Sequence, residues 1–322
     1  MMRHGFLLLV LLSGLLASGI DAAPAQSLSG KQIKIVVPYP AGGTGDVVAR
    51  LIAQTIAEKT GQTIIVEDRP GASSIVGTEF VSRATPDGTT LLLAENPFIL
   101  SAILYPGHYD PVSSFEPVCY VAATPAVFAV SSKSDIQSLA DFIKLAKTKA
   151  GAASYGSTGP ASIVHIAGEL FKRDAKIDVT YAPYPGSPPA MNATLAGTIT
   201  AVMANYSDLK GQIDAGTLRP IAVLTKNRVD ALPNVPTLAE NGFNDLDASV
   251  WFAFVVPAKT PKETIAQLSG YISDAVKVPA VAERLKGQGM FVKLFCGAEF
   301  GSFLADQKSK YTEFTRAFDI KP

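Results

Sequence analysis

Two glycine-containing loops carry the residue types and spacing best suited to chemistry in this sequence. One reads PYPAGGTGD over residues 38–46, and the other reads SYGSTGPAS over residues 154–162. In both, glycine permits positive φ, so that successive backbone N–H groups turn outward, and an amphipathic helix is predicted to follow. The first turn of a helix offers free N–H groups and about half a positive charge. Each loop is therefore predicted to attract a carboxylate or a phosphate.

The first loop leaves alternatives open. It is not a dinucleotide fingerprint, because Gly43-Thr44-Gly45 is followed by Asp-Val-Val where a third glycine is needed, and no GxxxxGK sequence is present. A tight turn without a ligand is the simpler interpretation. Asp46 either accepts backbone hydrogen bonds that brace the loop or receives an amine of a ligand. We favour bracing, because a carboxylate beside a bound anion would repel it.

The second loop repeats the arrangement and adds hydroxyl groups. Ser157, Thr158 and Ser162 supply further hydrogen-bond donors, and Pro160 suits the first turn of a helix because no N–H is needed there. Open α/β sheets bind ligands at the carboxyl ends of their strands. Two such ends that face each other across a cleft are predicted to hold an anion from both sides.

Catalysis is not expected from these residues. Ser157 and His165 are a conceivable nucleophile and base, but no third group is evident to orient the imidazole, and no GxSxG sequence is present. We expect His165 to lie on an exposed or secondary face of its helix. The sequence has no HExxH motif, no cluster of Cys and His, and no acidic calcium loop. We therefore predict a binding protein that needs no metal and no cofactor.

Alternating strands and helices must position the two loops. β-branched runs such as residues 31–37 alternate with helices whose apolar residues recur at i, i+3, i+4 and i+7, as over residues 48–56. This alternation predicts an α/β protein with mostly parallel sheets. Since each loop opens its own strand–turn–helix unit, we expect two lobes.

We expect one lobe to be formed by two separate segments of the chain and the other by a single segment. We assign residues 26–124 and 225–322 to the first lobe and residues 125–224 to the second. The chain would then cross between lobes twice, near Thr124–Pro125 and near Leu224–Thr225. These crossings predict a hinge.

The composition excludes several classes of protein. The chain has 322 residues, 48% of them hydrophobic, with 28 Lys+Arg and 28 Asp+Glu. Disorder requires low hydrophobicity and high net charge, and nucleic-acid binding requires a basic face, so a formal net charge of zero fits neither. The length suits one large or two ordinary domains with a substantial core.

Residues 1–25 have the features of a secretory signal peptide. Arg3 supplies a positive start, residues 6–16 form an apolar run, and Ala23-Pro24-Ala25 offers an Ala-x-Ala cleavage site. The run is too short to cross a bilayer about 30 Å thick, so we expect cleavage before Gln26 rather than a membrane anchor. We expect the mature protein to be soluble, without membrane insertion.

The two cysteines, Cys119 and Cys296, lack the CxxC spacing of a metal or redox site. Pairing is possible in an oxidising compartment. We favour two free thiols, because Cys119 lies in an apolar run, where buried free thiols are common.

Several segments of the chain resemble one family of proteins. They read IVVPYPAGGTGDVVARLIA (35–53), VEDRPGASSIVG (66–77), TPDGTTLL (85–92), YGSTGPASIVHIAGELF (155–171), LPNVPTLAENGF (232–243) and WFAFVVPAKTP (251–261). In this order, over nearly the whole chain after residue 25, they are closely similar to the Bug-type substrate-binding proteins of tripartite tricarboxylate transporters.

The resemblance implies a monomeric periplasmic protein with a two-lobed, type II-like "Venus flytrap" fold. It further implies that the cleft closes on a small carboxylated solute, and that the loaded protein docks on a membrane permease with a large and a small subunit. A protein that reports its ligand to a membrane sensor would have the same fold and pocket. That alternative stays open.

The resemblance also implies a set of ligand-binding residues. In the family, the two glycine-containing loops hold a ligand carboxylate through backbone N–H groups and bridging waters. The corresponding positions are Tyr39, Ala41, Gly42, Gly43, Thr44 and Asp46 in the first loop, Ser157, Thr158, Gly159, Ala161 and Ser162 in the second, and Asn96 after the third strand.

The chain also departs from the family pattern. Where relatives carry carboxylates in a Val-Asp-x-Met-Phe-Asp sequence, this chain has Thr200 and Asn205, and Pro185 stands before Gly186 where relatives have Lys or Arg. If Thr200 and Asn205 face the cleft, with Asn205 binding the ligand, the pocket is less suited to an amine. The hypothesis that follows is a plain organic or aromatic acid rather than an amino acid.

Overall fold

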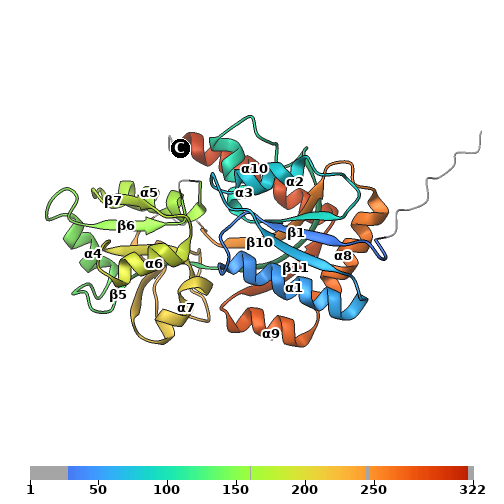
Figure 1. Ribbon diagram of the computed structural model, residues 1–322. Coiled ribbons are helices and arrows are strands. Elements are labelled where there is room, and N and C mark those ends of the chain that lie inside the picture. The colour runs from blue at the N-terminus through green and yellow to red at the C-terminus, as the bar shows by residue number, and fades with distance from the viewer. Residues whose placement is uncertain (1–27, 160, 244–246, 318–322) are drawn as a thin grey trace, which may run out of the picture.

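The computed structural model describes residues 28–159, 161–243 and 247–317. The signal peptide expected over residues 1–25, with cleavage before Gln26, lies outside these residues. Figure 1 shows two lobes side by side, each with its own sheet between helices. The two-lobed α/β architecture predicted from the sequence is confirmed.

Lobe 1 is built on a six-stranded sheet whose strands come from both ends of the chain. The strand order is β11 (Phe291–Cys296), β4 (Phe115–Thr124), β10 (Val250–Pro257), β3 (Thr90–Ala94), β1 (Ile33–Val37) and β2 (Ile64–Asp68). The β-branched sequence of β1, IKIVV, suits a strand that is buried between two helical layers.

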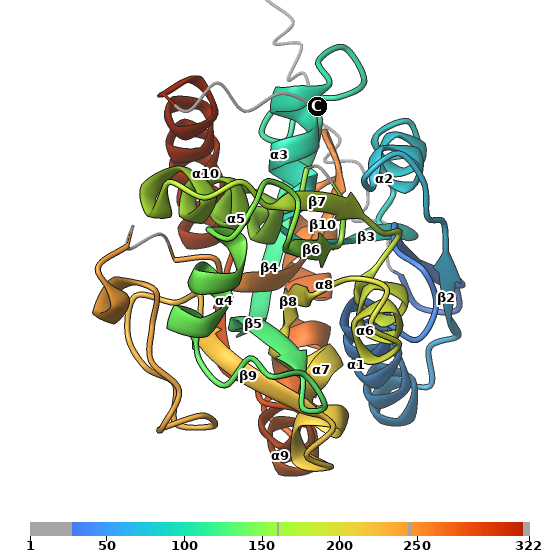
Figure 2. The same ribbon diagram turned by 90° about the vertical axis from the view of Figure 1, so that its left-hand side faces the viewer.

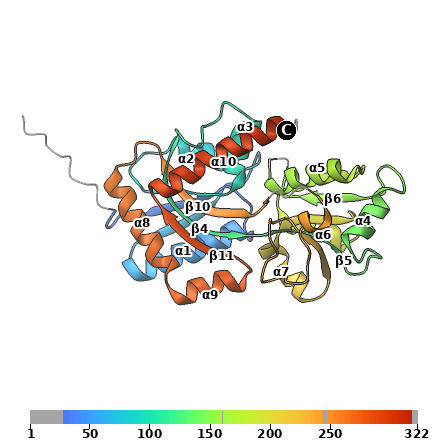
Figure 3. The same ribbon diagram turned by 180° about the vertical axis from the view of Figure 1, so that it is seen from behind.

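Helices cover both faces of this sheet (Figures 1 and 3). They are α1 (Thr44–Thr60), α8 (Lys262–Val276) and α9 (Pro279–Gly287) on one face, and α2 (Ile75–Ser82), α3 (Asn96–Leu104) and α10 (Ala298–Ala317) on the other. α1 buries Val48, Ile52 and Ile56, which lie four residues apart and therefore on one side of the helix. Gly61 ends α1 in the left-handed conformation, with φ of 72°, and donates its N–H to the carbonyl of Ala57.

Lobe 2 is built on a five-stranded sheet with the order β7 (Thr180–Pro183), β6 (Ser154–Ser157), β8 (Ala201–Asn205), β5 (Ala126–Ser131) and β9 (Leu218–Val223). In Figure 2, α4 (Leu139–Ala146) and α5 (Ile163–Ala175) lie on one side of the sheet, and α6 (Ser187–Leu195) and α7 (Tyr206–Asp214) on the other. Successive residues of β5 serve the two faces. The Phe128 ring packs on Phe142 of α4 and Phe171 of α5, whereas Val127 belongs to the cluster around Leu209 of α7.

Both sheets are mixed, which corrects the expectation that they are mostly parallel. β1 pairs parallel with β2 and β3, and β6 pairs parallel with β7 and β8. The pairs β3–β10, β10–β4, β4–β11, β8–β5 and β5–β9 are antiparallel. The reason lies in the crossings. A strand that enters its lobe from the cleft, β10 in lobe 1 and β5 in lobe 2, must run opposite to strands whose carboxyl ends face the cleft.

Cys119 and Cys296 form a disulfide, so the expectation of two free thiols is wrong. The cysteines are 177 residues apart in sequence, but β4 and β11 pair antiparallel in a register that puts Cys296 opposite Cys119. Their Cα atoms lie 4.0 Å apart. The apolar run around Cys119 reflects its place in a buried strand and carries no information about its partner.

The first passage between lobes is short. β4 ends at Thr124 in the lobe 1 sheet, and β5 begins at Ala126 in the lobe 2 sheet. We keep the proposal that the chain changes lobe, and bends on closure, at Thr124–Pro125.

The second passage lies in the segment between β9 and β10. After β9, Thr237 forms an isolated parallel bridge with Val223, and the ring of Phe243 packs on Phe171 with centroids 5.1 Å apart. These contacts hold residues 225–243 against lobe 2. We therefore propose that lobe 2 extends beyond the boundary expected at Leu224–Thr225.

Candidate functional site

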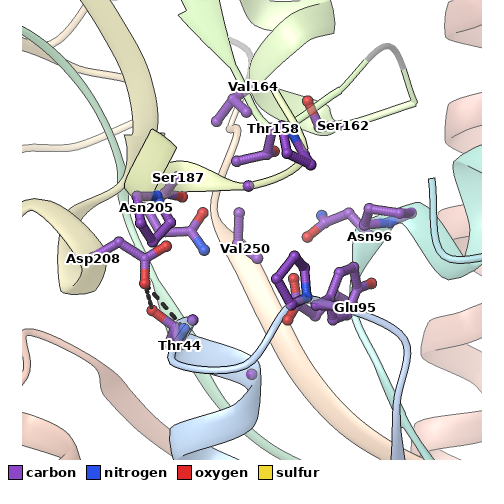
Figure 4. A pocket seen from close by; sticks show the side chains of 18 of the residues that line it. Thr44, Glu95, Asn96, Thr158, Ser162, Val164, Ser187, Asn205, Asp208 and Val250 are labelled. Carbon is purple, nitrogen blue, oxygen red and sulfur yellow. Dashed lines mark hydrogen bonds between the residues drawn. The ribbon is translucent and has the colours of Figure 1, made fainter. Parts of the chain in front are cut away.

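A cavity of about 220 Å³ lies between the lobes, where the N-termini of several helices meet (Figure 4). Its wall in lobe 1 contains the starts of α1 and α3, and its wall in lobe 2 contains the starts of α5, α6 and α7. The lining residues from these starts are Gly43, Thr44, Gly45, Glu95, Asn96, Pro97, Ser162, Ile163, Val164, Gly186, Ser187, Pro188, Pro189, Asn205 and Asp208. A cavity of this volume has room for several water molecules and suits a small solute.

These helices begin at the cavity because the strands before them end there. β1, β3, β6, β7 and β8 lead into α1, α3, α5, α6 and α7, respectively. The carboxyl ends of strands are where open α/β sheets bind ligands. The glycine-containing loops predict the termini of α1 and α5, and the structure adds those of α3, α6 and α7.

Asp46 braces the β1–α1 loop. Gly42 has a positive φ of 82°, and its N–H donates to Asp46 Oδ2 at 2.9 Å. Arg50, one turn further along α1, pairs with Asp46 Oδ1 at 2.5 Å. Asp46 does not line the cavity, whereas Gly43 and Thr44 do. Of the two roles considered for Asp46, the structure therefore shows bracing.

Asp208 of α7 connects the lobes beside the cavity. Its Oδ1 accepts hydrogen bonds from the Thr44 N–H at 3.0 Å and from Thr44 Oγ1 at 2.5 Å (Figure 4). Burial raises the pKa of Asp208, although the hydrogen bonds from Ser187 and Thr44 act in the opposite direction. Asp208 thus accepts the hydrogen bond of the Thr44 N–H at the start of α1, and this N–H is no longer available to a ligand carboxylate.

The β6–α5 loop leaves more of its helix terminus available. Ser162 is the N-cap of α5, where its Oγ accepts a hydrogen bond from the His165 N–H at 3.2 Å and donates to the Gly159 carbonyl at 2.8 Å. The backbone N–H groups of Ile163 and Val164 have no acceptor among the described residues. Both residues line the cavity.

Most of the residues expected to bind a ligand lie at this cavity. Tyr39, Ala41, Gly43, Thr44, Asn96, Thr158, Ser162 and Asn205 line it. Gly159 and Ala161 line a neighbouring pocket that shares Tyr39, Thr158 and Ser162 with the cavity. Gly42, Asp46 and Ser157 line neither of these two pockets. They form hydrogen bonds within lobe 1 and lobe 2 instead, between Gly42 and Asp46 and between Ser157 and Tyr181.

Asn96 lines the cavity, but its side-chain amide is engaged within lobe 1. Its Nδ2 donates to the Ser249 carbonyl at 3.2 Å and to Tyr311 Oη at 2.8 Å. Its Oδ1 accepts a hydrogen bond from the Trp251 N–H at 3.3 Å. These bonds fix the start of α3 against β10 and α10, so Asn96 has a positioning role.

Glu95, the residue before Asn96, is a lining residue that sequence analysis missed. Its side chain is 7% exposed, and no described residue forms a hydrogen bond with its carboxyl group. Burial and, in second place, the charge of Asp208 raise the pKa of Glu95 well above its usual range. Gly45 permits this placement, since a Cβ atom there would lie 2.5 Å from Glu95 Oε1.

The cavity contains acidic side chains but no basic ones. Among the described lining residues are Glu95 and Asp208, and there is neither Lys nor Arg. Thr200 lies elsewhere in lobe 2, where its Oγ1 accepts a hydrogen bond from the Ser154 N–H at 3.0 Å. The condition set for the hypothesis against a ligand amine is met by Asn205, which lines the cavity, but not by Thr200. Thr200 is outside the cleft, and Glu95 and Asp208 provide carboxylates there.

The conceivable pair of Ser157 and His165 is engaged otherwise. Ser157 Oγ donates to Tyr181 Oη at 3.3 Å, and the His165 ring stacks on Tyr181 with centroids 4.1 Å apart. His165 is 7% exposed, and Tyr181 of β7 covers its ring. Of the two positions expected for His165, the structure therefore shows the secondary helix face and not the exposed one. In the described part of the chain, no group of three His, Cys, Asp or Glu residues is placed to hold a metal ion.

The missed lining residues come mainly from the segment after β7 and from the start of α7. The Pro-Gly-Ser-Pro-Pro sequence of residues 185–189 is a turn followed by prolines at a helix start, a signal that could have been recognised. Asp208 stands three residues after Asn205, but its approach to Thr44 depends on how the lobes pack. No helix within the described ranges combines the length and apolar character needed to cross a bilayer.

Comparison with known proteins gives a consistent picture. Residues 48–319 match the protein family described as tripartite tricarboxylate transporter family receptor. The sequence is 31% identical to Protein BugT of Bordetella pertussis over 319 residues, which cover 98% of each chain.

Solved structures give similar matches. The structure of the periplasmic binding protein BugD is similar with a TM-score of 0.85 and 27% identity, over 90% of this chain and 98% of that one. R. palustris Rpa4515 with adipate is similar with a TM-score of 0.85 and 27% identity, over 91% of this chain and 99% of that one.

Proposed function

The chain belongs to the tripartite tricarboxylate transporter receptor family, and we propose that it captures a small carboxylic acid between its lobes and delivers it to the permease of such a transporter. The family and the fold are those of binding receptors. The proposal therefore includes no chemical conversion of the ligand.

The convergence of helix N-termini on one cavity is the observation that carries this proposal. α1, α3, α5, α6 and α7 all begin there, and the N–H groups of Ile163 and Val164 have no acceptor among the described residues. Such termini favour anionic groups, and a carboxylate is one of them. The relative Rpa4515, whose structure contains adipate, supports a carboxylate as the ligand class.

The energetics do not require a cationic side chain. Micromolar affinity corresponds to about 8.2 kcal/mol. Charge-assisted hydrogen bonds contribute roughly 1.5–3 kcal/mol each, and a helix terminus roughly 0.3–2 kcal/mol. A few N–H contacts from the lobe 2 wall, together with apolar contacts, are sufficient.

A thermal-shift screen with mono- and dicarboxylates, aromatic acids and amino acids tests the ligand class. A ligand at 100 times its Kd is expected to stabilise the protein by about 2.7 kcal/mol. Absence of a shift with every carboxylate would contradict the proposal.

A charge substitution at Thr158 tests the location. Thr158 lines the cavity next to the α5 terminus. Thr158→Asp places a competing carboxylate there, and we expect the affinity for the best carboxylate to fall at least 100-fold by calorimetry. Thr158→Asn, the neutral control of similar size, is expected to bind within about fivefold of wild type. Equal binding by both variants would place the ligand elsewhere.

The cellular setting is part of the same proposal. We expect residues 1–25 to be removed on export to the periplasm, so N-terminal sequencing of periplasmic protein should begin at Gln26. The loaded receptor should stimulate ligand uptake by the cognate permease in proteoliposomes. Uptake that is independent of the receptor, together with ligand-dependent binding to a membrane sensor, would favour the sensory alternative.

A further inference from the structure

Glu95 faces the ligand cavity without a partner of its own. It precedes Asn96 at the start of α3, and in Figure 4 it lies across the cavity from Asp208 and Asn205. The side chain is 7% exposed, and no described residue donates a hydrogen bond to it. A buried carboxyl group without a partner costs stability unless something else compensates it. A positively charged group of a ligand in the cavity can supply the missing contact.

The charges of the two cavity walls differ. On the lobe 1 side, the α1 terminus is already faced by carboxylates, with Asp46 on the Gly42 N–H and Asp208 on the Thr44 N–H. Glu95 Oε1 lies close above Gly45 on the same terminus. On the lobe 2 side, α5 is capped by the neutral Ser162. A ligand carboxylate is therefore attracted to the α5 terminus of lobe 2 and repelled by the acids at the α1 terminus of lobe 1, among which Asp208 comes from α7 of lobe 2.

The same arrangement attracts a positive group to lobe 1. A plain dicarboxylate would add two negative charges to a cavity that holds Glu95 and Asp208 and no lining Lys or Arg among the described residues. A ligand with one carboxylate and one ammonium group adds none. Its ammonium group would supply the hydrogen bonds and the charge that Glu95 lacks.

We infer that Glu95 determines specificity by receiving an ammonium group, so that the ligand is an amino-carboxylic acid oriented with its carboxylate on lobe 2. This inference rests on the proposed function and names the substrate class more closely. It reverses the hypothesis of a plain acid drawn from Thr200 and Asn205.

The protonation of Glu95 gives the inference a second readout. Burial raises the pKa of Glu95 in the empty cavity, and binding of ammonium requires the ionised form. The titratable groups that interact with Glu95 are Asp208 on α7 and Tyr39 on the β1–α1 loop. Burial raises the pKa of Tyr39 well above its usual value, so Tyr39 stays neutral. Affinity for an amino acid is therefore expected to rise between pH 5 and pH 8.

Calorimetry with matched ligand pairs tests the inference. The probes are succinate with L-aspartate, glutarate with L-glutamate, and pentanoate with 5-aminopentanoate, titrated into wild type, Glu95→Gln and Glu58→Gln. The last variant makes the same change on an exposed site of α1. Circular dichroism checks that each variant is folded.

We expect the amino member of at least one pair to bind wild type and Glu58→Gln at least tenfold more tightly than the plain member. Glu95→Gln should remove this preference, flatten the pH dependence, and leave the plain member unchanged or bound more tightly. A wild type that prefers plain acids, or a preference that survives Glu95→Gln, would overturn the inference and leave the proposed function standing. Failure of every carboxylate to bind wild type would overturn both.

Discussion

The two walls of the cleft present helix N-termini in different electrostatic states. In lobe 1, the α1 terminus is faced by the carboxylates of Asp46 and Asp208, with Glu95 close by. In lobe 2, the α5 terminus is capped by the hydroxyl of Ser162, and the N–H groups that follow have no acceptor among the described residues. One wall is neutralised by the chain itself, and the other keeps its positive character.

This difference gives the cleft a direction. A helix terminus attracts an anion only while the acids of the chain leave its N–H groups available. Two similar strand–loop–helix units can therefore differ in whether they attract an anionic or a cationic group of a ligand. The variants below change residues at or beside the cleft, and Asp110, which does not line the cavity, provides a comparison.

Gly45→Ala should disturb the lobe 1 wall most. The new Cβ would lie 2.5 Å from Glu95 Oε1 and 2.8 Å from Leu93 Cδ2, so both side chains must move. We expect a loss of about 1–3 kcal/mol in unfolding free energy and weaker binding of amino acids. Gly43→Ala is the control, because its Cβ meets only the Pro40 carbonyl at 3.5 Å. Chemical denaturation that shows equal losses for both variants would refute the close contact.

Glu95→Gln should stabilise the empty protein at neutral pH. Because burial raises the pKa of Glu95 above its unfolded value, wild type loses stability as pH rises above about 4. Glutamine does not titrate, so its advantage should be on the order of 1 kcal/mol at pH 7 and vanish near pH 4. The measurement is thermal unfolding of both proteins across this range.

Asp110→Asn should change the stability in the opposite direction to Glu95→Gln. Burial of Asp110 is outweighed by hydrogen bonds from Lys308 and from the Ser113 and Val112 N–H groups, which lower its pKa to about 2. The variant should be less stable than wild type at pH 7, and this difference should shrink as the pH falls towards 2. If Glu95→Gln also destabilises the protein at pH 7, Glu95 has a partner in the free protein.

Ser162→Ala should weaken the lobe 2 wall. It removes the acceptor of the His165 N–H at the α5 N-cap, which typically costs about 1 kcal/mol, and it should also lower carboxylate affinity. Ser138→Ala removes the corresponding acceptor at the α4 N-cap, away from the cavity. Urea titration should give similar stability losses for the two variants. An equal loss of ligand affinity in both would argue against a binding role for the α5 terminus.

Asp208→Asn should have the smallest effect on ligand affinity, and it tests whether the acids at the α1 terminus repel a ligand carboxylate. It removes a negative charge beside the α1 terminus and keeps an acceptor for the Thr44 N–H. We expect a few-fold gain in affinity for glutarate, since like-charge repulsion falls. Asp214→Asn changes an exposed acid at the other end of α7 and should leave the affinity unchanged. Reduced glutarate binding by Asp208→Asn would contradict the assigned charge distribution.

The parts of the site that depend on local sequence pattern could be predicted from the sequence. Glycine in a strand–turn–helix sequence predicts an outward-facing helix terminus, and the loops at residues 38–46 and 154–162 both reach the cavity. The bracing role of Asp46 follows from its place in the first turn of α1.

The remaining features depend on contacts between distant segments. The approach of Asp208 to Thr44 spans 164 residues, and the Cys119–Cys296 disulfide needs the register of β4 and β11. The direction of β10 depends on where the chain re-enters lobe 1. Glu95 stands in an ordinary position after β3, and its isolation is visible only when its neighbours are in place.

The most direct test is a crystal structure of the protein with its tightest-binding carboxylic acid. The account predicts that the carboxylate accepts hydrogen bonds of about 2.7–3.2 Å from the N–H groups of Ile163 or Val164, with no Lys or Arg side chain in contact. A ligand bound outside the cleft, or a carboxylate held mainly by a cationic side chain, would contradict it.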